Sequence, residues 1–290
     1  MTFLAPLASD LMNRLNLLPI PRVENISPGD FRSLYLEPNR PVVIKDLAST
    51  WPALKKWTLE YFAKKYGDLP VKVYNVSFAK AGATYMSSLR KIPFKEYLRL
   101  MTTTAIDLRM FAFNASWQTP ELAKDIGFPA IAEGFSKKMV FMFFGCKSSI
   151  TPMHYDPDLR HLFHTVFRGK KRVVLFTNEE SRNLYKHPFN TRSYVDVDHP
   201  DFDRFPRLKN VTGYEEIVHP GETLFIPSGY WHYMVYEEAG FAVCTRCSNS
   251  SWAKTLRGYV NILVFFPIDK IMNKLFPVRW FQWKEERSFR

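Results

Sequence analysis

Between residues 138 and 250 the chain consists of short apolar runs separated by turns, and this pattern limits its possible folds more than any other feature. Met139–Phe144 and Val173–Phe176 are two such runs, and a turn at 227–229 ends a third. Runs of this length that are rich in β-branched and aromatic residues predict strands. The first 135 residues mix short strands with helical patterns, such as the one that Thr58 can cap and Gly67 can end. We therefore expect a mainly β fold with flanking helices.

The length of 290 residues is compatible with one large or two small domains. Hydrophobic residues make up 46% of the chain, which allows a packed core and excludes a disordered chain. Because the predicted strands straddle the middle of the sequence, we expect a single domain over residues 1–290. It would contain a helix-rich part with edge strands (1–135), a double-stranded β-helix or jelly-roll core (136–250) and a helical tail (251–290). Further helices are expected over Ser9–Leu18, Thr119–Gly127 and Asn178–Tyr185.

The tripeptide His154-Tyr-Asp156 lies between two of the predicted strands. In a strand, residues two positions apart point to the same face, so His154 and Asp156 can point into one cavity. Two histidines and one carboxylate that leave open coordination positions describe the site of non-haem Fe(II) oxygenases. We expect the second histidine to be His232, just past the turn at 227–229. The alternative is ordinary surface or hydrogen-bonded histidines, because the chain has seven.

Three motifs together resemble the JmjC/cupin-like 2-oxoglutarate oxygenases: Thr151-Pro-Met-His-Tyr-Asp156, Gly169-Lys-Lys-Arg172 and the stretch from Pro220 to His232. The sequence is most similar to the small single-domain kind, such as the asparaginyl hydroxylase of hypoxia-inducible factor. The resemblance covers roughly residues 20–250. It implies Fe(II) bound by His154, Asp156 and His232, and 2-oxoglutarate as a cosubstrate that is split to succinate and CO2.

The resemblance also implies residues that contact 2-oxoglutarate. Lys171 would bind the far carboxylate, with the Thr151 hydroxyl beside it. A register slip of one residue would replace Lys171 by Lys170 or Arg172. Two further residues are candidate contacts: His161, where the family often has Asn, and Arg246, which lies near an Asn that lines the site in relatives. The alternative for Arg246 is an exposed arginine on the outside of the barrel.

The function that the resemblance implies is hydroxylation of a protein side chain. The same chemistry on a small molecule, such as an amino acid or a natural product, is one alternative. Demethylation is another outcome known in the wider family. A metal-binding cupin without turnover is an alternative from another functional class. The net charge of +12 suggests an acidic partner, yet no specific nucleic-acid motif is evident.

The tail from 251 to 290 carries apolar residues at helical spacing, as in Ile268–Phe276. It could pack on its own barrel, form a homodimer interface, as in some members of the family, or contact a membrane surface. The longest apolar stretch, Val260–Ile268, is too short to span a bilayer. With three cysteines and no signal-like start, we expect a cytoplasmic protein without a transmembrane segment.

Overall fold

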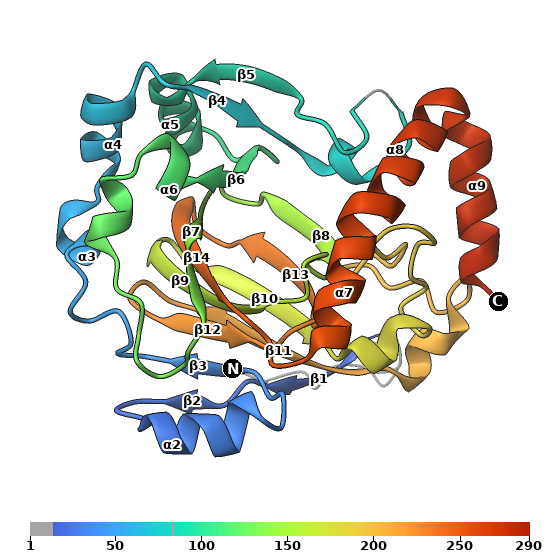
Figure 1. The fold of residues 1–290 in the computed structure, drawn as a ribbon. Coiled ribbons are helices and arrows are strands. Elements are labelled where there is room, and N and C mark those ends of the chain that lie inside the picture. Colours follow the sequence, from blue (N-terminus) through green and yellow to red (C-terminus); the bar gives the residue numbers. More distant parts are fainter. Residues whose placement is uncertain (1–13, 83) are drawn as a thin grey trace, which may run out of the picture.

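Two sheets face each other and form the double-stranded β-helix in the computed structural model, which describes residues 14–82 and 84–290 (Figure 1). The smaller sheet has the strand order β1-β11-β10-β13-β8, and the larger has β2-β3-β12-β9-β14-β7-β6. A separate hairpin pairs β4 with β5. The strands are β1 (Asn16–Pro19), β2 (Arg22–Val23), β3 (Val42–Ile44), β4 (Pro70–Val73), β5 (Arg90–Pro93), β6 (Arg109–Asn114), β7 (Phe135–Gly145), β8 (Ile150–His154), β9 (His161–Arg168), β10 (Lys171–Phe176), β11 (Thr212–Val218), β12 (Thr223–Ile226), β13 (Trp231–Tyr236) and β14 (Gly240–Cys247). The expected jelly-roll core with flanking helices is confirmed.

Helical segments surround the barrel. They are α2 (Pro28–Phe31), η1 (Arg32–Leu36), α3 (Ala53–Lys56), α4 (Leu59–Tyr66), η2 (Val76–Ala79), α5 (Phe94–Thr103), α6 (Ala115–Gln118), η3 (Leu122–Asp125), η4 (Asn178–Ser181), η5 (Pro206–Asn210), α7 (Trp252–Val260), η6 (Asn261–Phe265), α8 (Phe266–Leu275) and α9 (Pro277–Ser288). The Thr58 hydroxyl caps α4 by accepting from the backbone N–H of Tyr61 at 3.0 Å. None of the described helices is long and apolar enough to cross a bilayer.

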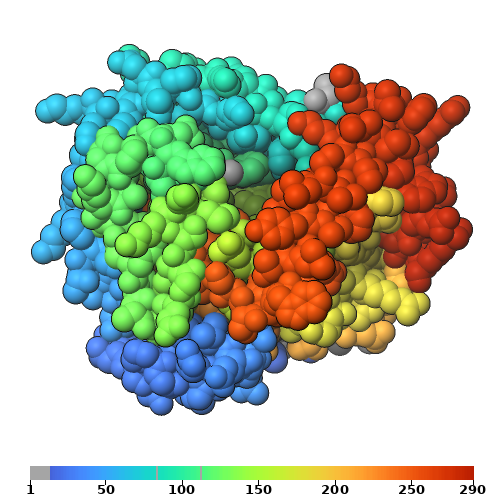
Figure 2. Space-filling model, viewed as in Figure 1, coloured from blue at the N-terminus to red at the C-terminus, as the bar shows by residue number. Residues whose placement is uncertain are grey.

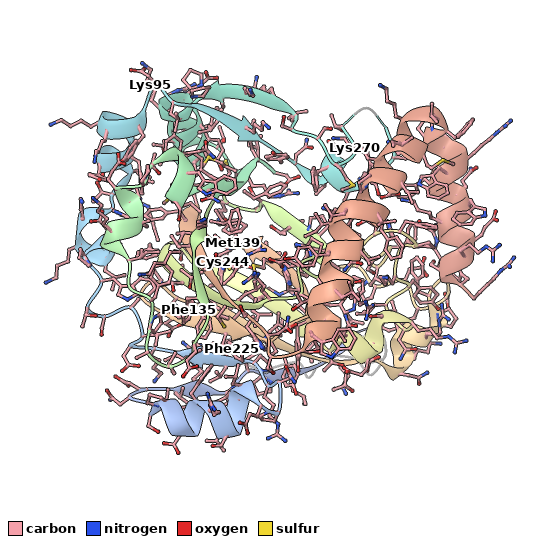
Figure 3. All side chains as sticks on the ribbon, in the orientation of Figure 1. Lys95, Phe135, Met139, Phe225, Cys244 and Lys270 are labelled. Carbon is pink, nitrogen blue, oxygen red and sulfur yellow. The ribbon has the colours of Figure 1, made fainter. Side chains whose placement is uncertain are left out.

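The side chains of the two sheets meet in a core inside the barrel. This core includes Val166, Leu175, Leu224 and Cys244, the last of which is labelled in Figure 3. A second apolar layer lies between the outer face of the large sheet and α2, where the ring centroids of Phe31 and Phe225 are 4.9 Å apart. Since both faces of the large sheet are covered, its central strands β9 and β14 are buried almost throughout rather than at alternate positions.

Three expected helices are wrong or shortened. Residues 9–13 of the expected Ser9–Leu18 helix lie outside the described residues, and Asn16–Pro19 is a strand that pairs in parallel with β11. In place of Thr119–Gly127 there is only the 3-10 turn η3, and in place of Asn178–Tyr185 only η4. Strand pairing with β11 overrides the helical spacing in the first case.

The tail forms three consecutive helices beside the end of the barrel where β8 lies (Figure 1). Trp280, Lys284 and Ser288 of α9 are buried. The tail therefore packs partly on its own barrel. However, α7 and α8 leave large apolar side chains exposed, including Trp252 at 79% and Leu263, in the segment η6 between them, at 68%.

Candidate metal centre

Strand pairing brings His154 and His232 together. His154 ends β8 and pairs directly with His232 of β13, and their ring centroids are 4.2 Å apart. Asp156 follows two residues after β8, where Pro157 comes next in the chain. Its Oδ1 lies 3.7 Å from Nε2 of His154 and 3.9 Å from Nε2 of His232. One ligand atom from each residue lies within 4.8 Å of the others, so the three could hold one metal ion.

Backbone carbonyls fix the orientation of both imidazoles. Nδ1 of His154 lies 2.8 Å from the carbonyl oxygen of Pro152, and Nδ1 of His232 lies 3.2 Å from that of Tyr230. A carbonyl can only accept, so each Nδ1 carries the hydrogen and each Nε2 keeps its lone pair. Both Nε2 lone pairs are then available to a metal ion. Histidines that bind metals usually donate their other ring N–H to an acceptor in this way.

Burial and neighbouring charges set the protonation of the triad. Burial lowers the pKa of His154 well below its ordinary value, and the neighbouring His232 adds to this effect. Burial also lowers the pKa of His232. For Asp156, burial alone would raise the pKa, but Arg246 and the two histidines hold it below its usual value. At neutral pH the site offers two neutral imidazoles and one carboxylate, which is the state that a divalent cation needs.

Arg246 is engaged by the protein's own carboxylates. Its guanidinium donates to Oδ2 of Asp156 at 2.6 Å and to Oδ2 of Asp158 at 2.7 Å. It therefore points into the barrel rather than to solvent, and its partners are these two aspartates. Asp156 keeps Oδ1 on the side of the histidines, so Arg246 orients the carboxylate without blocking it. Sequence reasoning missed Asp158 and this positioning contact.

Lys171 is buried inside the barrel, with 1% of its surface exposed. Its Nζ lies 3.0 Å from Nε2 of His164 and 4.3 Å from the ring centroid of Tyr236. Among the residues that the structure describes, no carboxylate forms an ion pair with Lys171. Burial consequently lowers the pKa of Lys171 to about 7. His164 thus lies with Lys171 rather than with the triad. Arg172 lies on the opposite face, in ion pairs with Asp198 and Glu215.

Thr151 and His161 occupy different sides of the barrel wall. Thr151 lies on β8, three residues before His154, and pairs with Met234 of β13. His161 accepts a hydrogen bond at Nδ1 from the backbone N–H of Ser228 at 3.1 Å and stacks on Phe225 in the outer layer. Because His161 and His164 are three positions apart on β9, they point to opposite faces. The structure therefore does not bring His161 to Lys171.

The molecular surface has a hollow between the C-terminal helices and the segment that contains α6 and the start of β7, as Figure 2 shows. Two features next to β8 were not predicted: an aromatic cluster of Tyr74, Phe78 and Phe111, and the guanidinium of Arg192 over the ring of Phe78. Because Arg192 lies on a loop that returns to β8 only in the folded chain, sequence spacing could not have revealed it.

The donor set fits iron and a dicarboxylic cosubstrate. Two imidazoles and one carboxylate with open positions are the ligands of non-haem Fe(II). A buried lysine without an acidic partner is suited to bind the carboxylate of a small molecule. Both groups are present in one barrel interior.

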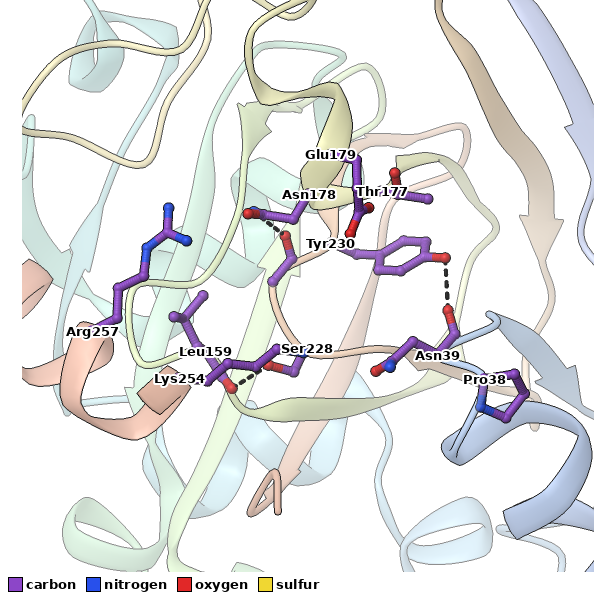
Figure 4. A pocket seen from close by; sticks show the side chains of 11 residues that line it. Pro38, Asn39, Leu159, Thr177, Asn178, Glu179, Ser228, Tyr230, Lys254 and Arg257 are labelled. Atoms are coloured by element: carbon purple, nitrogen blue, oxygen red, sulfur yellow. Dashed lines mark hydrogen bonds between the residues drawn. The ribbon is translucent and has the colours of Figure 1, made fainter. Parts of the chain in front are cut away.

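A separate cavity of about 440 Å³ lies on another part of the molecule (Figure 4). A hydrogen bond from the Tyr230 hydroxyl to the carbonyl oxygen of Asn39 and one from Asn178 to Gly229 cross its wall. Lys254 and Arg257 of α7 also line it. No member of the triad does, so this cavity is distinct from the metal centre.

Comparison with known proteins agrees with this geometry. Residues 28–262 match the family described as cupin-like domain. Lysine-specific demethylase 8 of Xenopus tropicalis is 31% identical over 241 residues, covering 77% of this chain and 52% of that protein. The bifunctional arginine demethylase and lysyl-hydroxylase psr-1 of Caenorhabditis briggsae is 29% identical, covering 82% and 65%. The human tRNA wybutosine-synthesizing protein 5 is 29% identical, covering 78% and 76%. The chain thus spans about half the length of the first of these relatives.

Proposed function

The chain belongs to the JmjC/cupin-like family of oxygenases, whose cofactors are Fe(II) and 2-oxoglutarate, and from this premise we propose that it is a dioxygenase that hydroxylates a protein side chain. The coproducts would be succinate and CO2. One observation carries the proposal: the His154, Asp156 and His232 triad lies in the same barrel as Lys171, a buried lysine without an acidic partner among the described residues.

The residues of the chain would have the following roles. His154, Asp156 and His232 would hold Fe(II), which supplies the oxidising chemistry together with O2. Lys171 would donate hydrogen bonds to the far carboxylate of 2-oxoglutarate, with the Thr151 hydroxyl nearby. The carbonyl contacts of the two histidines fix the ligands before the metal arrives, so little reorganisation is needed on binding.

The buried surroundings of Lys171 would exclude water from the cosubstrate carboxylate. The rings of Tyr236 and Phe143 lie 4.3 and 5.9 Å from Nζ. In such a dry environment an ammonium–carboxylate contact is stronger than at the surface. This arrangement supports specific recognition of a dicarboxylic acid.

Other substrates remain as alternative proposals. The names of two relatives refer to lysine or arginine demethylation and to lysyl hydroxylation, and that of a third refers to tRNA modification. A small-molecule substrate is the second candidate, since the same metal centre could act on either kind of substrate. A cupin that binds metal without turnover is the third.

Succinate formation tests the proposal. Wild-type protein, His154→Ala and the exposed control His199→Ala are incubated with Fe(II), ascorbate and 2-oxoglutarate, without added substrate, and succinate is followed by NMR. We expect slow turnover in wild type and His199→Ala and none in His154→Ala. Equal rates in all three proteins would contradict the ligand assignment. If no protein turns over, titration with 2-oxoglutarate decides, because wild type without affinity for it would leave only the non-catalytic cupin.

We also propose that the protein forms a homodimer through residues 251–290 and is cytoplasmic. Exposed apolar side chains along α7 and α8 support the first proposal. Cys146, Cys244 and Cys247 are all free, which suits a reducing compartment.

A further inference from the structure

Arg192 lies in the same row of side chains as the two histidines. Its backbone forms an antiparallel bridge with His154, which pairs on its other side with His232. Residues directly opposite each other on antiparallel strands point to the same face, with Cβ atoms about 4.5–5.5 Å apart. The row His232, His154, Arg192 therefore directs the arginine side chain toward the triad. The backbone N–H of Tyr155 donates to the carbonyl oxygen of Thr191 at 3.0 Å and holds this segment against β8.

The guanidinium of Arg192 has no anionic partner in the described chain. Its Cζ lies 4.6 Å from the ring centroid of Phe78, and no side-chain hydrogen bond or ion pair engages its five donors. Two nearby arginines are matched: Arg246 pairs with Asp156 and Asp158, and Arg109 pairs with Asp107. Although burial lowers the pKa of Arg192 to about 10, the group remains charged at neutral pH. A partly desolvated cation without an anionic partner thus lies beside the triad.

Binding of Fe(II) and 2-oxoglutarate would not provide an anionic partner for Arg192. The two positive charges of Fe(II) and that of Lys171 are matched by Asp156 and the dianionic 2-oxoglutarate. Arg246 is matched by Asp158, at 2.7 Å. Of the charged groups just named, Arg192 is the one that keeps an uncompensated charge. A lysine or arginine side chain that approached it would be repelled.

We propose that Arg192 binds a carboxylate or phosphate group of the substrate and holds that group beside the metal centre. This inference rests on the proposed function and specifies its substrate class as anionic. A guanidinium over an aromatic ring presents a planar fork of N–H donors, which matches both oxyanions in a bidentate manner. The substrate would then differ from the basic side chains that the names of the demethylase relatives indicate.

Paramagnetic broadening tests this proposal without turnover. The protein is loaded with less than one equivalent of Mn(II), saturated with 2-oxoglutarate and mixed with one probe at a time. The probes are inorganic phosphate and the N-acetyl amides of aspartate, asparagine and lysine. NMR line widths report which probe binds near the metal. The variants are Arg192→Met, which keeps the volume, Arg192→Lys, which keeps the charge, and the control Arg90→Met, at an exposed site on β5.

We expect wild type, Arg90→Met and Arg192→Lys to broaden the NMR lines of at least one anionic probe. In Arg192→Met this line broadening should be at least about tenfold smaller. The phosphate and aspartate arms distinguish the two oxyanions. The asparagine and lysine probes should remain sharp throughout. Equal broadening in wild type and Arg192→Met, no broadening of either anion in wild type, or a preference for the lysine probe would overturn the proposal. Since the side chain of Arg192 makes no hydrogen bond and its backbone contacts do not depend on the side chain, neither substitution should unfold the protein.

A 2-oxoglutarate titration of the same samples separates this proposal from the proposed function. If wild type does not bind 2-oxoglutarate, both the oxygenase proposal and the role of Arg192 fail. If it binds normally but Arg192→Met leaves the probe spectra unchanged, only the role of Arg192 fails.

Discussion

At the scale of single residues, Lys171 favours ligand binding at the expense of stability. A buried ammonium without a carboxylate destabilises the folded state, so Lys171→Met should raise the free energy of unfolding of the ligand-free protein, by roughly 1–4 kcal/mol. The same change would remove the proposed charged hydrogen bond to 2-oxoglutarate, which is worth about 3 kcal/mol or roughly a hundredfold in Kd. Urea unfolding and calorimetric titration measure the two effects.

The control for Lys171→Met is Arg172→Met, the neighbour on the opposite face of β10. It should lose its surface ion pairs at a cost of about 1 kcal/mol or less and leave the affinity for 2-oxoglutarate unchanged. If Arg172→Met weakened binding and Lys171→Met did not, the assignment of the cosubstrate cation would be wrong.

The depressed pKa of Lys171 also predicts how cosubstrate binding depends on pH. Burial holds this pKa at about 7, so the ammonium is present below pH 7 and lost as the pH rises above it. Binding of a dianion above pH 7 requires uptake of a proton, and affinity should fall by up to about tenfold per pH unit. Titrations with 2-oxoglutarate at pH 6.5, 7.5 and 8.5 measure this slope. Lys171→Met should bind weakly with no slope, whereas a flat profile in wild type would refute the prediction.

Residue types and motif spacing along the chain were enough to predict that His154, Asp156 and His232 lie together, although β8 ends at His154 and Asp156 lies two residues beyond it. The partners of these residues could not be predicted in the same way. Arg246 reaches Asp156 from a strand 90 positions later, and His164 reaches Lys171 across the barrel. Such contacts depend on strand register and on side-chain length, which a sequence pattern does not encode.

At the scale of secondary-structure elements, a buried polar cluster attaches the C-terminal helices to the loop that carries Arg192. Asp269 of α8 accepts from Nζ of Lys284 at 2.7 Å and from Asn190 at 2.5 Å, and it also bonds the Tyr85 hydroxyl. The side chain of Asn190 in turn accepts from the backbone N–H of Thr191 at 2.8 Å. The helices α8 and α9 therefore help to fix the segment beside the triad.

Breaking this cluster should be costly. Asp269→Leu leaves Lys284 buried and unpaired, and we expect the free energy of unfolding to fall by about 3–5 kcal/mol. The double variant Asp269→Leu/Lys284→Met should recover much of this loss, because it removes both charges. Lys270→Met on the exposed side of α8 (Figure 3) is the control and should change stability by about 0.5 kcal/mol or less. Urea unfolding measures all three, and equal losses in the single and double variants would exclude an unpaired charge as the cause.

Sequence motifs predicted secondary-structure elements correctly where the hydrogen bonds of the backbone are made between residues that are close in sequence. The cap at Thr58 defined the start of α4 correctly, and Ser27 likewise caps α2 by accepting from the N–H of Asp30 at 3.0 Å. Asn16–Pro19, in contrast, has helical spacing but gains its hydrogen bonds from β11, almost 200 residues away in sequence. Long-range pairing of this kind cannot be inferred from a local window.

At the scale of the whole molecule, the exposed apolar face of the C-terminal helices predicts self-association. Trp252, Leu256, Leu263 and Ile271 are between 55% and 79% exposed on consecutive helical segments. Large exposed apolar surfaces on a soluble protein often mark sites of interaction with another protein. A stable dimer needs about 800 Å² from each partner, which two or three helical turns of large side chains can provide. We therefore expect wild-type protein to sediment as a dimer at micromolar concentration.

Leu263→Asp would place a charge in the middle of this face and should convert the dimer to a monomer. Because an unpaired buried charge costs several kcal/mol, the dissociation constant of the dimer should rise by at least about a hundredfold. Ile106→Asp, at a site 43% exposed in the segment before β6, introduces the same charge away from the C-terminal helices and should leave the dimer intact. Sedimentation equilibrium distinguishes the two outcomes. A wild-type protein that remains monomeric at 100-fold higher concentration would show that this face does not mediate self-association. The helix α8 also contacts the loop that carries Arg192, through the hydrogen bond between Asp269 and Asn190. Dimerisation could therefore affect the metal centre, and the rate of succinate formation by the Leu263→Asp monomer would show whether it does.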